Sequence, residues 1–230
     1  MSRQNIAIFG STGSIGESTL NIIRENPNLF KVVTLVAGKN IKKLINQINE
    51  FYPKNVYIIE KENAEYIKKL YKDINVYYGE EGMEEISNLK DYDISISALV
   101  GIAGLKPTYN MIKNGKTVAL ANKEVLVTGG KLIIESAKES GAKLLTVDSE
   151  HSAIFQVLNG ERQNSLKKIW LTASGGPFRG RTFEELKSVS VEDALKHPVW
   201  AMGRKISIDS ATLVNKGLEV MEAKWLFGVG

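Results

Sequence analysis

Short apolar runs alternate with amphipathic segments along the first two thirds of the chain. Continuous apolar runs bounded by turn residues are typical of buried strands, and apolar positions three and four apart are typical of helices that pack on a sheet. We expect strands at residues 5–9, 31–37, 56–59, 74–78, 94–98, 117–121 and 144–147. We expect helices at residues 15–25, 41–48, 62–71, 83–89, 105–114 and 124–140. This alternation predicts an α/β fold with a doubly wound parallel sheet.

The pattern changes after residue 147. We expect one further strand at 168–172, a polar segment with short helical stretches at 178–204, and one long helix at 210–227. We therefore predict two domains, a doubly wound domain over residues 1–147 and an α+β catalytic domain over residues 148–230.

The first predicted strand leads directly into a glycine-rich turn, Gly10 to Gly16 with the sequence GSTGSIG, and then into a helix. Glycines let the backbone approach a pyrophosphate, and a helix N-terminus supplies N–H donors and a favourable dipole. A plain tight turn is the alternative. The strand–turn–helix context favours a dinucleotide site in a Rossmann-type domain.

The residues after the second predicted strand indicate which dinucleotide binds. NAD-specific sites usually carry an Asp or Glu about 20 residues beyond the glycines, where it binds the ribose 2′-hydroxyl. No acidic residue occurs between Glu25 and Glu50, and Lys39 occupies the expected place. A cation there favours a 2′-phosphate, so we expect NADPH. We interpret Lys42 and Lys43 as the solvated face of an amphipathic helix.

Two acidic residues follow the apolar run that ends at Val147. Side chains two apart at the end of a strand share one face, so Asp148 and Glu150 can direct two carboxylates at one point. Such ligands, at the sheet edge where α/β proteins bind their substrates, suit a divalent cation such as Mg²⁺ or Mn²⁺. The alternative is the acidic N-terminus of a short helix that Ser149 starts.

Asn122, Lys123 and Glu124 also come directly after a predicted strand, in a position typical of residues that contact a ligand. Asn122 as a helix N-cap is an equally good interpretation. A cap does not require a lysine, so Lys123 is the strongest of the three as a site residue.

A loop of small residues, 173–178, offers backbone N–H groups and the Ser174 hydroxyl to a phosphate. The polar segment 178–204 carries His197 and Trp200, and we expect it to form a lid that excludes water from a substrate. A surface excursion with Trp200 packed on its own domain is the alternative. His151 lies on a predicted helix beside core residues, and we interpret it as structural.

The last predicted helix places Asn215, Lys216 and Glu219 on one flank, because they are three and four residues apart. Glu219 can complete a metal site with Asp148 and Glu150, and Asn215 and Lys216 can present donors to a phosphate. An ordinary surface ion pair is the alternative for Lys216 and Glu219.

Composition narrows the class of protein. The 230 residues, 43% of them hydrophobic, suffice for one large core or two modest ones. A net charge of +4 without a basic block argues against nucleic-acid binding and suits an anionic small molecule. The absence of cysteine excludes disulfides, thiolate metal sites and a cysteine nucleophile, and fits the cytoplasm. We find neither a signal peptide nor an apolar run long enough for a membrane span.

Seven sequence blocks, in order across nearly the whole chain, resemble the 1-deoxy-D-xylulose 5-phosphate reductoisomerase family. They are GSTGSIG (10–16), VAGKN (36–40), LANKE (120–124), VDSEHSAIFQ (147–156), SGGPF (174–178), HPVWAMGRKISIDSAT (197–212) and NKGLEVMEAKWLF (215–227). A glycine motif alone would be weak support, whereas these blocks with this spacing are specific.

The resemblance implies three groups of site residues. The metal ligands, for Mn²⁺, Mg²⁺ or Co²⁺, are Asp148, Glu150 and Glu219. The residues around the substrate phosphate are Ser174, Ser210, Asn215 and Lys216, and those at its hydroxyl and carbonyl end are Lys123, Ser149 and His197, beside Glu150 and Glu219. Lys123 and His197 count as catalytic together with the three carboxylates. The residues that contact NADPH are Thr12, Gly13, Ser14, Ile15, Gly38, Lys39, Asn40, Asn122, Glu124 and Gly203.

The resemblance also implies a reaction. A metal-bound phosphorylated ketose, 1-deoxy-D-xylulose 5-phosphate, rearranges to a branched aldehyde, and NADPH reduces that aldehyde to 2-C-methyl-D-erythritol 4-phosphate. A cation beside the carbonyl, a phosphate anchor and a closed lid are consistent with this chemistry. Family members form homodimers and continue well past the position of Gly230, so we expect a fragment with an incomplete catalytic domain. We expect that it binds NADPH and is inactive or poorly stable alone.

Two other classes of protein remain open. Another NADP-dependent oxidoreductase is the nearer one, but an aspartate-semialdehyde dehydrogenase needs a cysteine that this chain lacks. A homoserine dehydrogenase gives no reason for the carboxylate pair at Asp148 and Glu150 together with the distant block 215–219. A non-catalytic NADPH-binding module would bind the cofactor without dependence on a metal.

Overall fold

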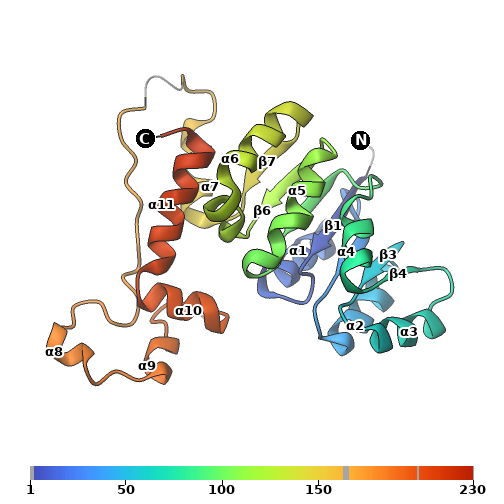
Figure 1. Ribbon diagram of the computed structural model, residues 1–230, viewed down its shortest axis with the longest axis horizontal. Helices are drawn as coiled ribbons and strands as arrows, with labels where there is room; N and C mark the ends of the chain where they lie inside the picture. Colours follow the sequence, from blue (N-terminus) through green and yellow to red (C-terminus); the bar gives the residue numbers. More distant parts are fainter. Residues whose placement is uncertain (1–2, 163–165, 201, 230) are drawn as a thin grey trace. The chain divides into compact units, whose positions relative to one another are not determined.

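The first part of the chain forms one sheet of seven parallel strands in the order β4-β3-β2-β1-β5-β6-β7 (Figure 1). The strands are β1 (Gln4–Phe9), β2 (Phe30–Val36), β3 (Asn55–Tyr57), β4 (Asn75–Tyr77), β5 (Ile94–Ser97), β6 (Thr117–Leu120) and β7 (Lys143–Thr146). The order reverses between β1 and β5, so the predicted doubly wound α/β sheet is confirmed.

This computed structural model describes residues 3–162, 166–200 and 202–229. It divides into two compact units, Met1–Asp148 and Ser149–Gly230. We call them the first and the second unit. Among the described residues, no helix combines the length and the apolar character that crossing a membrane requires.

Helices follow the strands of the first unit in regular alternation. They are α1 (Ser14–Glu25), α2 (Ile41–Phe51), α3 (Lys61–Leu70), α4 (Gly79–Ser87), the 3-10 turn η1 (Gly101–Gly104), α5 (Leu105–Lys113) and α6 (Lys123–Ser140). Each lies close to its predicted position; α4 begins four residues earlier than the predicted start at Met83.

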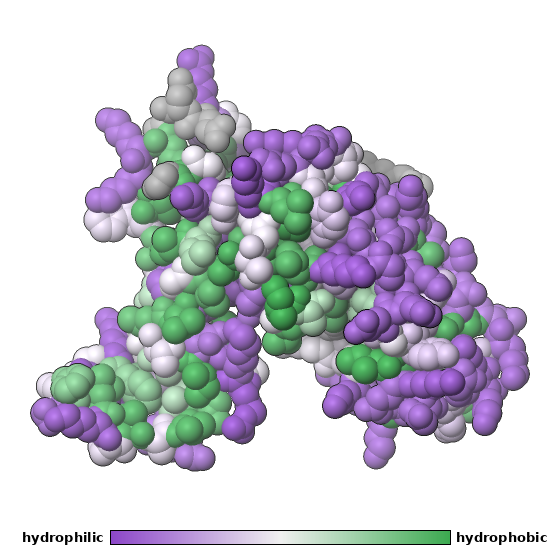
Figure 2. All heavy atoms as spheres, viewed as in Figure 1, coloured by the Kyte–Doolittle hydropathy of each residue, from purple (hydrophilic) through white to green (hydrophobic). Residues whose placement is uncertain are grey.

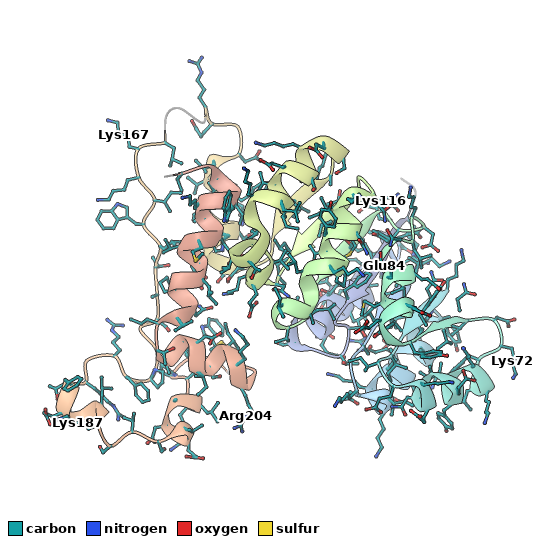
Figure 3. The ribbon with its side chains drawn as sticks, viewed as in Figure 1. Lys72, Glu84, Lys116, Lys167, Lys187 and Arg204 are labelled. Atoms are coloured by element: carbon teal, nitrogen blue, oxygen red, sulfur yellow. The ribbon has the colours of Figure 1, made fainter. Side chains whose placement is uncertain are left out.

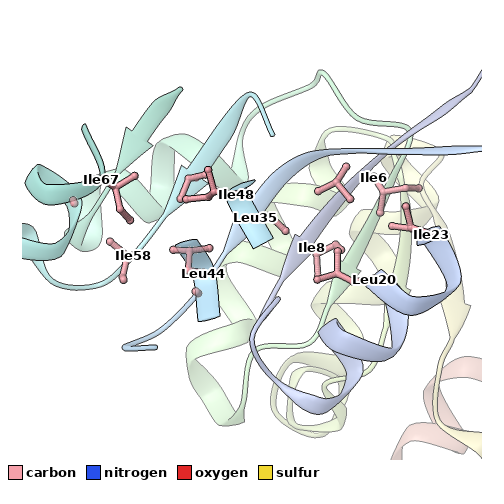
Figure 4. Close-up of a cluster of buried hydrophobic side chains, with 13 residues drawn as sticks. Ile6, Ile8, Leu20, Ile23, Leu35, Leu44, Ile48, Ile58 and Ile67 are labelled. Carbon is pink, nitrogen blue, oxygen red and sulfur yellow. The ribbon is translucent and has the colours of Figure 1, made fainter. Parts of the chain in front are cut away.

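One hydrophobic core packs α1, α2 and α3 against the strands. Ile6 and Ile8 of β1 share a face because alternate residues of a strand point the same way. They meet Leu20 from α1 and Leu44 from α2, and all of these side chains are at most 4% exposed (Figure 4). Full burial of such a side chain contributes about 1.5–3 kcal/mol, so this face holds α1 and α2 firmly beside the ends of β1 and β2.

The remaining helices of the first unit form a second group, in which α4, α5 and α6 contact one another in sequence. Helices α5 and α6 lie in front of the sheet in Figure 1. Lys106 of α5 forms an ion pair at 2.6 Å with Glu84 of α4, which Figure 3 labels. The sheet is therefore covered by helices on both faces, as a parallel sheet requires.

The second unit is helical. Its helices are α7 (Ser149–Leu158), α8 (Phe183–Leu186), α9 (Val191–Leu195), α10 (Arg204–Ala211) and α11 (Val214–Phe227). The predicted strand at 168–172 is wrong, because no strand occurs in the described part of this unit. A strand needs a neighbour for its backbone hydrogen bonds, and Trp170, 78% exposed, has no sheet to pack on.

The prediction of a single helix over 210–227 is also wrong. Leu213 adopts the left-handed conformation with a φ of 60°, which ends α10 and separates it from α11. The Thr212 hydroxyl donates to Ile208 O at 2.9 Å and so engages a carbonyl near the end of α10. Ser210 consequently lies on α10, whereas Asn215, Lys216 and Glu219 lie on α11.

The polar segment 178–204 contains two very short helices with complete capping boxes. Thr182 and Glu185 cap α8 reciprocally, as Ser190 and Asp193 cap α9. Phe183 is 75% exposed, and Figure 2 shows apolar side chains gathered over α8 and α9. Ala201, inside the predicted lid, lies outside the described residues.

Candidate functional site

The glycine-rich turn lies at the carboxyl end of β1, where the strand order reverses. Gly10 has a φ of +101°, and a Cβ there would lie 2.4 Å from Ala98 O. A Cβ on Gly16 would lie 2.4 Å from Gly10 O. Only glycine fits these two positions, and the turn leaves Gly13 and Ser14 exposed at the N-terminus of α1. This geometry suits an anion on the helix N-terminus.

The second cofactor segment, 38–40, follows β2 directly. It lies beside the glycine turn because Gly10 N and Ser11 N both donate to Val36 O, at 2.8 and 2.9 Å. Asn40 caps α2, since its side chain accepts a hydrogen bond from the Lys43 backbone N–H at 3.1 Å. Lys39 and Asn40 are exposed. A cation and an amide therefore stand where a ribose 2′-phosphate would lie.

Lys43 is half-buried, and it makes contacts that our interpretation as part of a solvated face did not include. Its ammonium donates to Thr12 O at 3.1 Å and pairs with Glu17 at 3.2 Å. Lys42 is exposed as expected. Sequence reasoning also missed Gln47, which is 3% exposed. The available signal was a polar residue inside an apolar helix face, because such a residue needs a buried partner.

Asn122 is the N-cap of α6, one of the two interpretations that the sequence left open. It caps α6 by accepting from Val125 N at 3.3 Å. Its amide donates to Leu99 O and Gly101 O, at 2.5 and 2.8 Å, so it connects the loops after β5 and β6. Glu124 lies half-buried in the first turn of α6.

Lys123, the first residue of α6, is buried with 9% exposure. Its Nζ lies 2.7 Å from Asp148 Oδ2, at the end of the segment that follows β7. The structure therefore brings together a lysine and a carboxylate that are 25 residues apart in sequence.

In the second unit, Glu150 of α7 and Glu219 of α11 converge on Lys216. The ammonium of Lys216 lies 3.1 Å from Glu150 Oε1 and also forms a close ion pair with Glu219. Asn215 donates to Glu219 Oε1 at 2.5 Å. Since Glu219 is only 1% exposed, the alternative of an ordinary surface ion pair is excluded.

The surroundings of Glu150 and Lys216 shift the pKa values of both side chains. Burial by itself would raise the pKa of Glu150, but hydrogen bonds from Ser149 and Lys216 outweigh it and lower the pKa. Burial would likewise lower the pKa of Lys216, whereas its bonds to Glu219 and Glu150 raise it. Both pKa shifts therefore favour the charged forms of Glu150 and Lys216.

The donor set fits a divalent cation. One oxygen of Glu150 and one of Glu219 lie within 4.8 Å of each other. Asp148, the third predicted ligand, lies two residues before Glu150 in the sequence. Carboxylate oxygens are the ligands that Mg²⁺ and Mn²⁺ prefer. Such a cation can take the place between the carboxylates that the Lys216 ammonium holds.

His151 is fully buried, and its Nε2 lies 2.9 Å from the backbone carbonyl of Glu219. Its Nδ1 lies 3.7 Å from a carboxylate oxygen of Glu222. The histidine thus connects α7 to α11 beside the two carboxylates, which agrees with its interpretation as a structural residue.

The phosphate-loop candidates form a second group in this unit. Ser174 Oγ lies 3.0 Å from His197 Nε2, and the backbone N–H groups of Val199 and Trp200 donate to His197 Nδ1 at 3.3 and 3.0 Å. Since Nδ1 accepts, the proton of neutral His197 resides on Nε2 and is donated to Ser174.

The same loop also reaches α10. A Cβ on Gly176 would lie 2.8 Å from Ser210 O, so the loop passes directly over the end of that helix. Gly203, also predicted to contact the cofactor, is the exposed N-cap of α10.

Comparison with known proteins gives one consistent result. A family model described as 1-deoxy-D-xylulose 5-phosphate reductoisomerase matches residues 6–130, and a model for the C-terminal domain of that enzyme matches residues 144–227. The reductoisomerases of Lachnospira eligens and Agathobacter rectalis are 52% and 53% identical to this chain over 228 residues, which are 98% of this chain and 60% of each relative.

Solved structures agree. A reductoisomerase in complex with NADPH, fosmidomycin and magnesium has a TM-score of 0.91 at 40% identity, over 98% of this chain and 59% of that one. The Zymomonas mobilis enzyme in complex with NADPH has a TM-score of 0.90 at 40% identity, over 99% of this chain and 59% of that one. The chain thus spans about 60% of the length of the curated relatives it matches.

Proposed function

Since the chain belongs to the 1-deoxy-D-xylulose 5-phosphate reductoisomerase family, we propose that it carries the NADPH and metal sites of an enzyme that converts 1-deoxy-D-xylulose 5-phosphate to 2-C-methyl-D-erythritol 4-phosphate in isoprenoid biosynthesis. One observation carries the proposal. Glu150 and Glu219 lie on helices that are far apart in sequence, and both contact the ammonium of Lys216. Glu150 comes two residues after Asp148 in the sequence.

The first unit is the NADPH-binding domain in this proposal. The open turn at 10–16 supports binding of the pyrophosphate, and Lys39 and Asn40 support binding of the 2′-phosphate. The residues assigned to the cofactor are Thr12, Gly13, Ser14, Ile15, Gly38, Lys39, Asn40, Asn122, Glu124 and, from the second unit, Gly203.

The second unit, together with Asp148 and Lys123, supplies the catalytic part. Asp148, Glu150 and Glu219 hold Mg²⁺, Mn²⁺ or Co²⁺, which when bound polarises the substrate carbonyl and the adjacent alkoxide. Lys123 donates to the same end of the substrate from its position beside Asp148.

The remaining residues anchor and enclose the substrate. Ser174, Ser210 and Asn215 donate to its phosphate, and Lys216 joins them when a cation replaces its ammonium between the carboxylates. His197 and Ser149 contact the hydroxyl and carbonyl end, and segment 178–204 closes over the substrate to exclude water.

Further parts of the proposal rest on family membership and on composition. They are a cytoplasmic location, a homodimer of the full-length enzyme, and no nucleic-acid or membrane partner. The chain covers 60% of the relative's length, and the second candidate is binding of NADPH without turnover.

Oxidation of NADPH tests the proposal. The chain is mixed with 1-deoxy-D-xylulose 5-phosphate and Mn²⁺, with and without a chelator, and compared with the variant Glu219→Gln. Turnover that chelator and substitution both abolish would support the enzyme. Binding of NADPH without turnover would support the second candidate, whereas failure to bind NADPH would contradict both.

A further inference from the structure

Two side chains of α2 hold the backbone of the glycine turn. Gln47 donates to Ser11 O at 3.0 Å, and the ammonium of Lys43 donates to Thr12 O at 3.1 Å. The donors are 36 and 31 residues beyond the carbonyls they bind. Because Gln47 is 3% exposed and Ser11 is fully buried, the first of these bonds is shielded from water.

These bonds decide where the N–H groups of the turn point. In a planar trans peptide the carbonyl and the following N–H point in opposite directions. Gln47, by holding Ser11 O, therefore turns the Thr12 N–H toward the opposite side of the loop. Lys43 holds the next peptide group, whose Gly13 N–H donates to Gly10 O at 3.1 Å and so closes the turn. The direction of the Thr12 N–H thus depends on Gln47 of α2, and the closed shape of the turn is supported by Lys43.

The same two side chains also engage a carboxylate beside the turn. Glu17, in the first turn of α1, accepts from Gln47 Nε2 at 2.5 Å and pairs with Lys43 at 3.2 Å. An uncompensated carboxylate at this helix N-terminus would repel a phosphate group. Lys43 neutralises Glu17, and Gln47 holds its side chain against α2.

Helix α2 further links the two ends of the cofactor site. It starts directly after 38–40, and Asn40 is its N-cap. Gln47 and Lys43 follow within its first two turns and reach back to the glycine turn. A ligand that orders residues 38–40 therefore acts on the same helix that orients the turn.

We propose that Gln47 and Lys43 are positioning residues for the dinucleotide, which hold the peptide groups of Ser11 and Thr12 in the orientation that binds the pyrophosphate. The inference rests on the proposed binding of NADPH. It predicts an effect on the part that NADPH and NADH share, and no discrimination by the 2′-phosphate.

Matched variants test this role in the whole chain. Gln47→Met keeps the size of the side chain and removes its donors, and Lys43→Met is paired with Lys42→Met, the same change at the exposed neighbour. We expect Gln47→Met and Lys43→Met to raise the Kd of both NADPH and NADH about five- to tenfold. Lys42→Met should stay within about twofold of the unmodified chain. An effect on NADPH alone, or an equal effect of Lys42→Met, would overturn the proposal.

Exchange of the amide of Gln47 and the carboxylate of Glu17 distinguishes an effect on cofactor affinity from an effect on stability. Gln47→Glu places two carboxylates together and should lower the unfolding midpoint of the ligand-free chain. The double variant Glu17→Gln with Gln47→Glu restores an amide–carboxylate bond between α1 and α2 but offers no donor to Ser11 O. We expect it to regain the unfolding midpoint without regaining affinity. Recovery of affinity together with stability would refute the role of the Ser11 bond.

Binding of NADPH by the unmodified chain distinguishes failure of the proposed function from failure of the positioning role alone. If it does not bind NADPH, the cofactor part of the proposed function fails, and the positioning role fails with it. If it binds NADPH and the Gln47 and Lys43 variants bind equally well, only the positioning role is refuted.

Discussion

Lys123 Nζ lies 2.7 Å from Asp148 Oδ2, and the two side chains are only 11% and 21% exposed. The pair joins the first residue of α6 to Asp148, which lies two residues after the end of β7. A charge in such a place needs its partner, because removal of one member leaves the other poorly solvated.

Lys123→Met should therefore destabilise the first unit by about 2–4 kcal/mol, since it leaves the Asp148 carboxylate without its partner ammonium. Chemical denaturation of the ligand-free chain measures this loss. Glu135→Gln is the control, because Glu135 pairs with Lys131 at 3.9 Å on an exposed surface and its loss should cost less than about 0.5 kcal/mol. Equal effects of the two substitutions would show that the Lys123 pair is energetically a surface pair.

Metal binding should stabilise the chain through Glu219. A ligand at 100 times its Kd adds about 2.7 kcal/mol to the free energy of unfolding. We expect Mn²⁺ to raise the thermal midpoint of the unmodified chain and to leave that of Glu219→Gln unchanged. Glu192→Gln, at an exposed position of α9, should retain the full shift. A full shift in Glu219→Gln would remove Glu219 from the metal site.

Tyr92 makes the first unit sensitive to alkaline pH. Burial raises the pKa of this phenol to about 12, above the value of 10 in an unfolded chain. Folding therefore favours the protonated phenol, and this contribution is complete below pH 10 and lost as the pH rises toward 12. A pKa difference of about 2 corresponds to about 2.7 kcal/mol.

Tyr92→Phe should accordingly lose less stability than the unmodified chain between pH 10 and 12, as measured by denaturation at each pH. Tyr52→Phe, at a side chain that is 76% exposed, should behave like the unmodified chain. The pKa values of Tyr57 and Tyr77 are also raised by burial, and their effect cancels because both remain in every variant. Parallel stability curves for Tyr92→Phe and the unmodified chain would contradict the prediction.

Neutral His197 should carry its proton on Nε2. Its Nδ1 accepts two backbone N–H bonds, from Val199 and Trp200, which leaves Nε2 as the donor to Ser174. Nitrogen-15 NMR distinguishes the two ring nitrogens, and the chain has only one other histidine. A signal for protonated Nδ1 in the neutral ring would disprove this arrangement.

Substitution of Gly217 should change stability and substrate affinity in opposite directions. A Cβ there would meet no atom within 4 Å, and the residue lies inside α11. Gly217→Ala should therefore stabilise the second unit by about 0.5–1 kcal/mol. The residue adjoins Lys216, so we expect a weaker affinity for the phosphorylated substrate at the same time, measured by calorimetry. Unchanged affinity would mean that the substrate does not approach α11 at this point.

The described strands and helices of the first unit follow from the sequence, because their signals are local. The period of apolar residues identifies strands such as β1 and helices such as α2. Gly10 and Gly16 mark the turn, and Lys39 marks the nature of the cofactor. The Asp148, Glu150 and Glu219 carboxylates are predicted as metal ligands from their residue type and from the family resemblance.

The missed features depend on partners that a local pattern does not identify. Residues 168–172 have the composition of a strand but form none, because a strand exists only with a neighbour to accept its hydrogen bonds. Residues 210–227 have the pattern of one helix, but Leu213 takes a left-handed conformation that the pattern does not encode.

The sequence by itself determined the alternation of strands and helices and the glycine turn, and it predicted the charged residues of the site. Only the tertiary structure decided that Gln47 and Lys43 hold the turn, and that Lys216 stands between Glu150 and Glu219. The physical reason is the range of each interaction. Periodicity and turn chemistry act between residues a few positions apart, whereas the bonds of Gln47 and Lys43 to the turn and the pair of Lys216 with Glu150 join groups that are 31 to 66 positions apart.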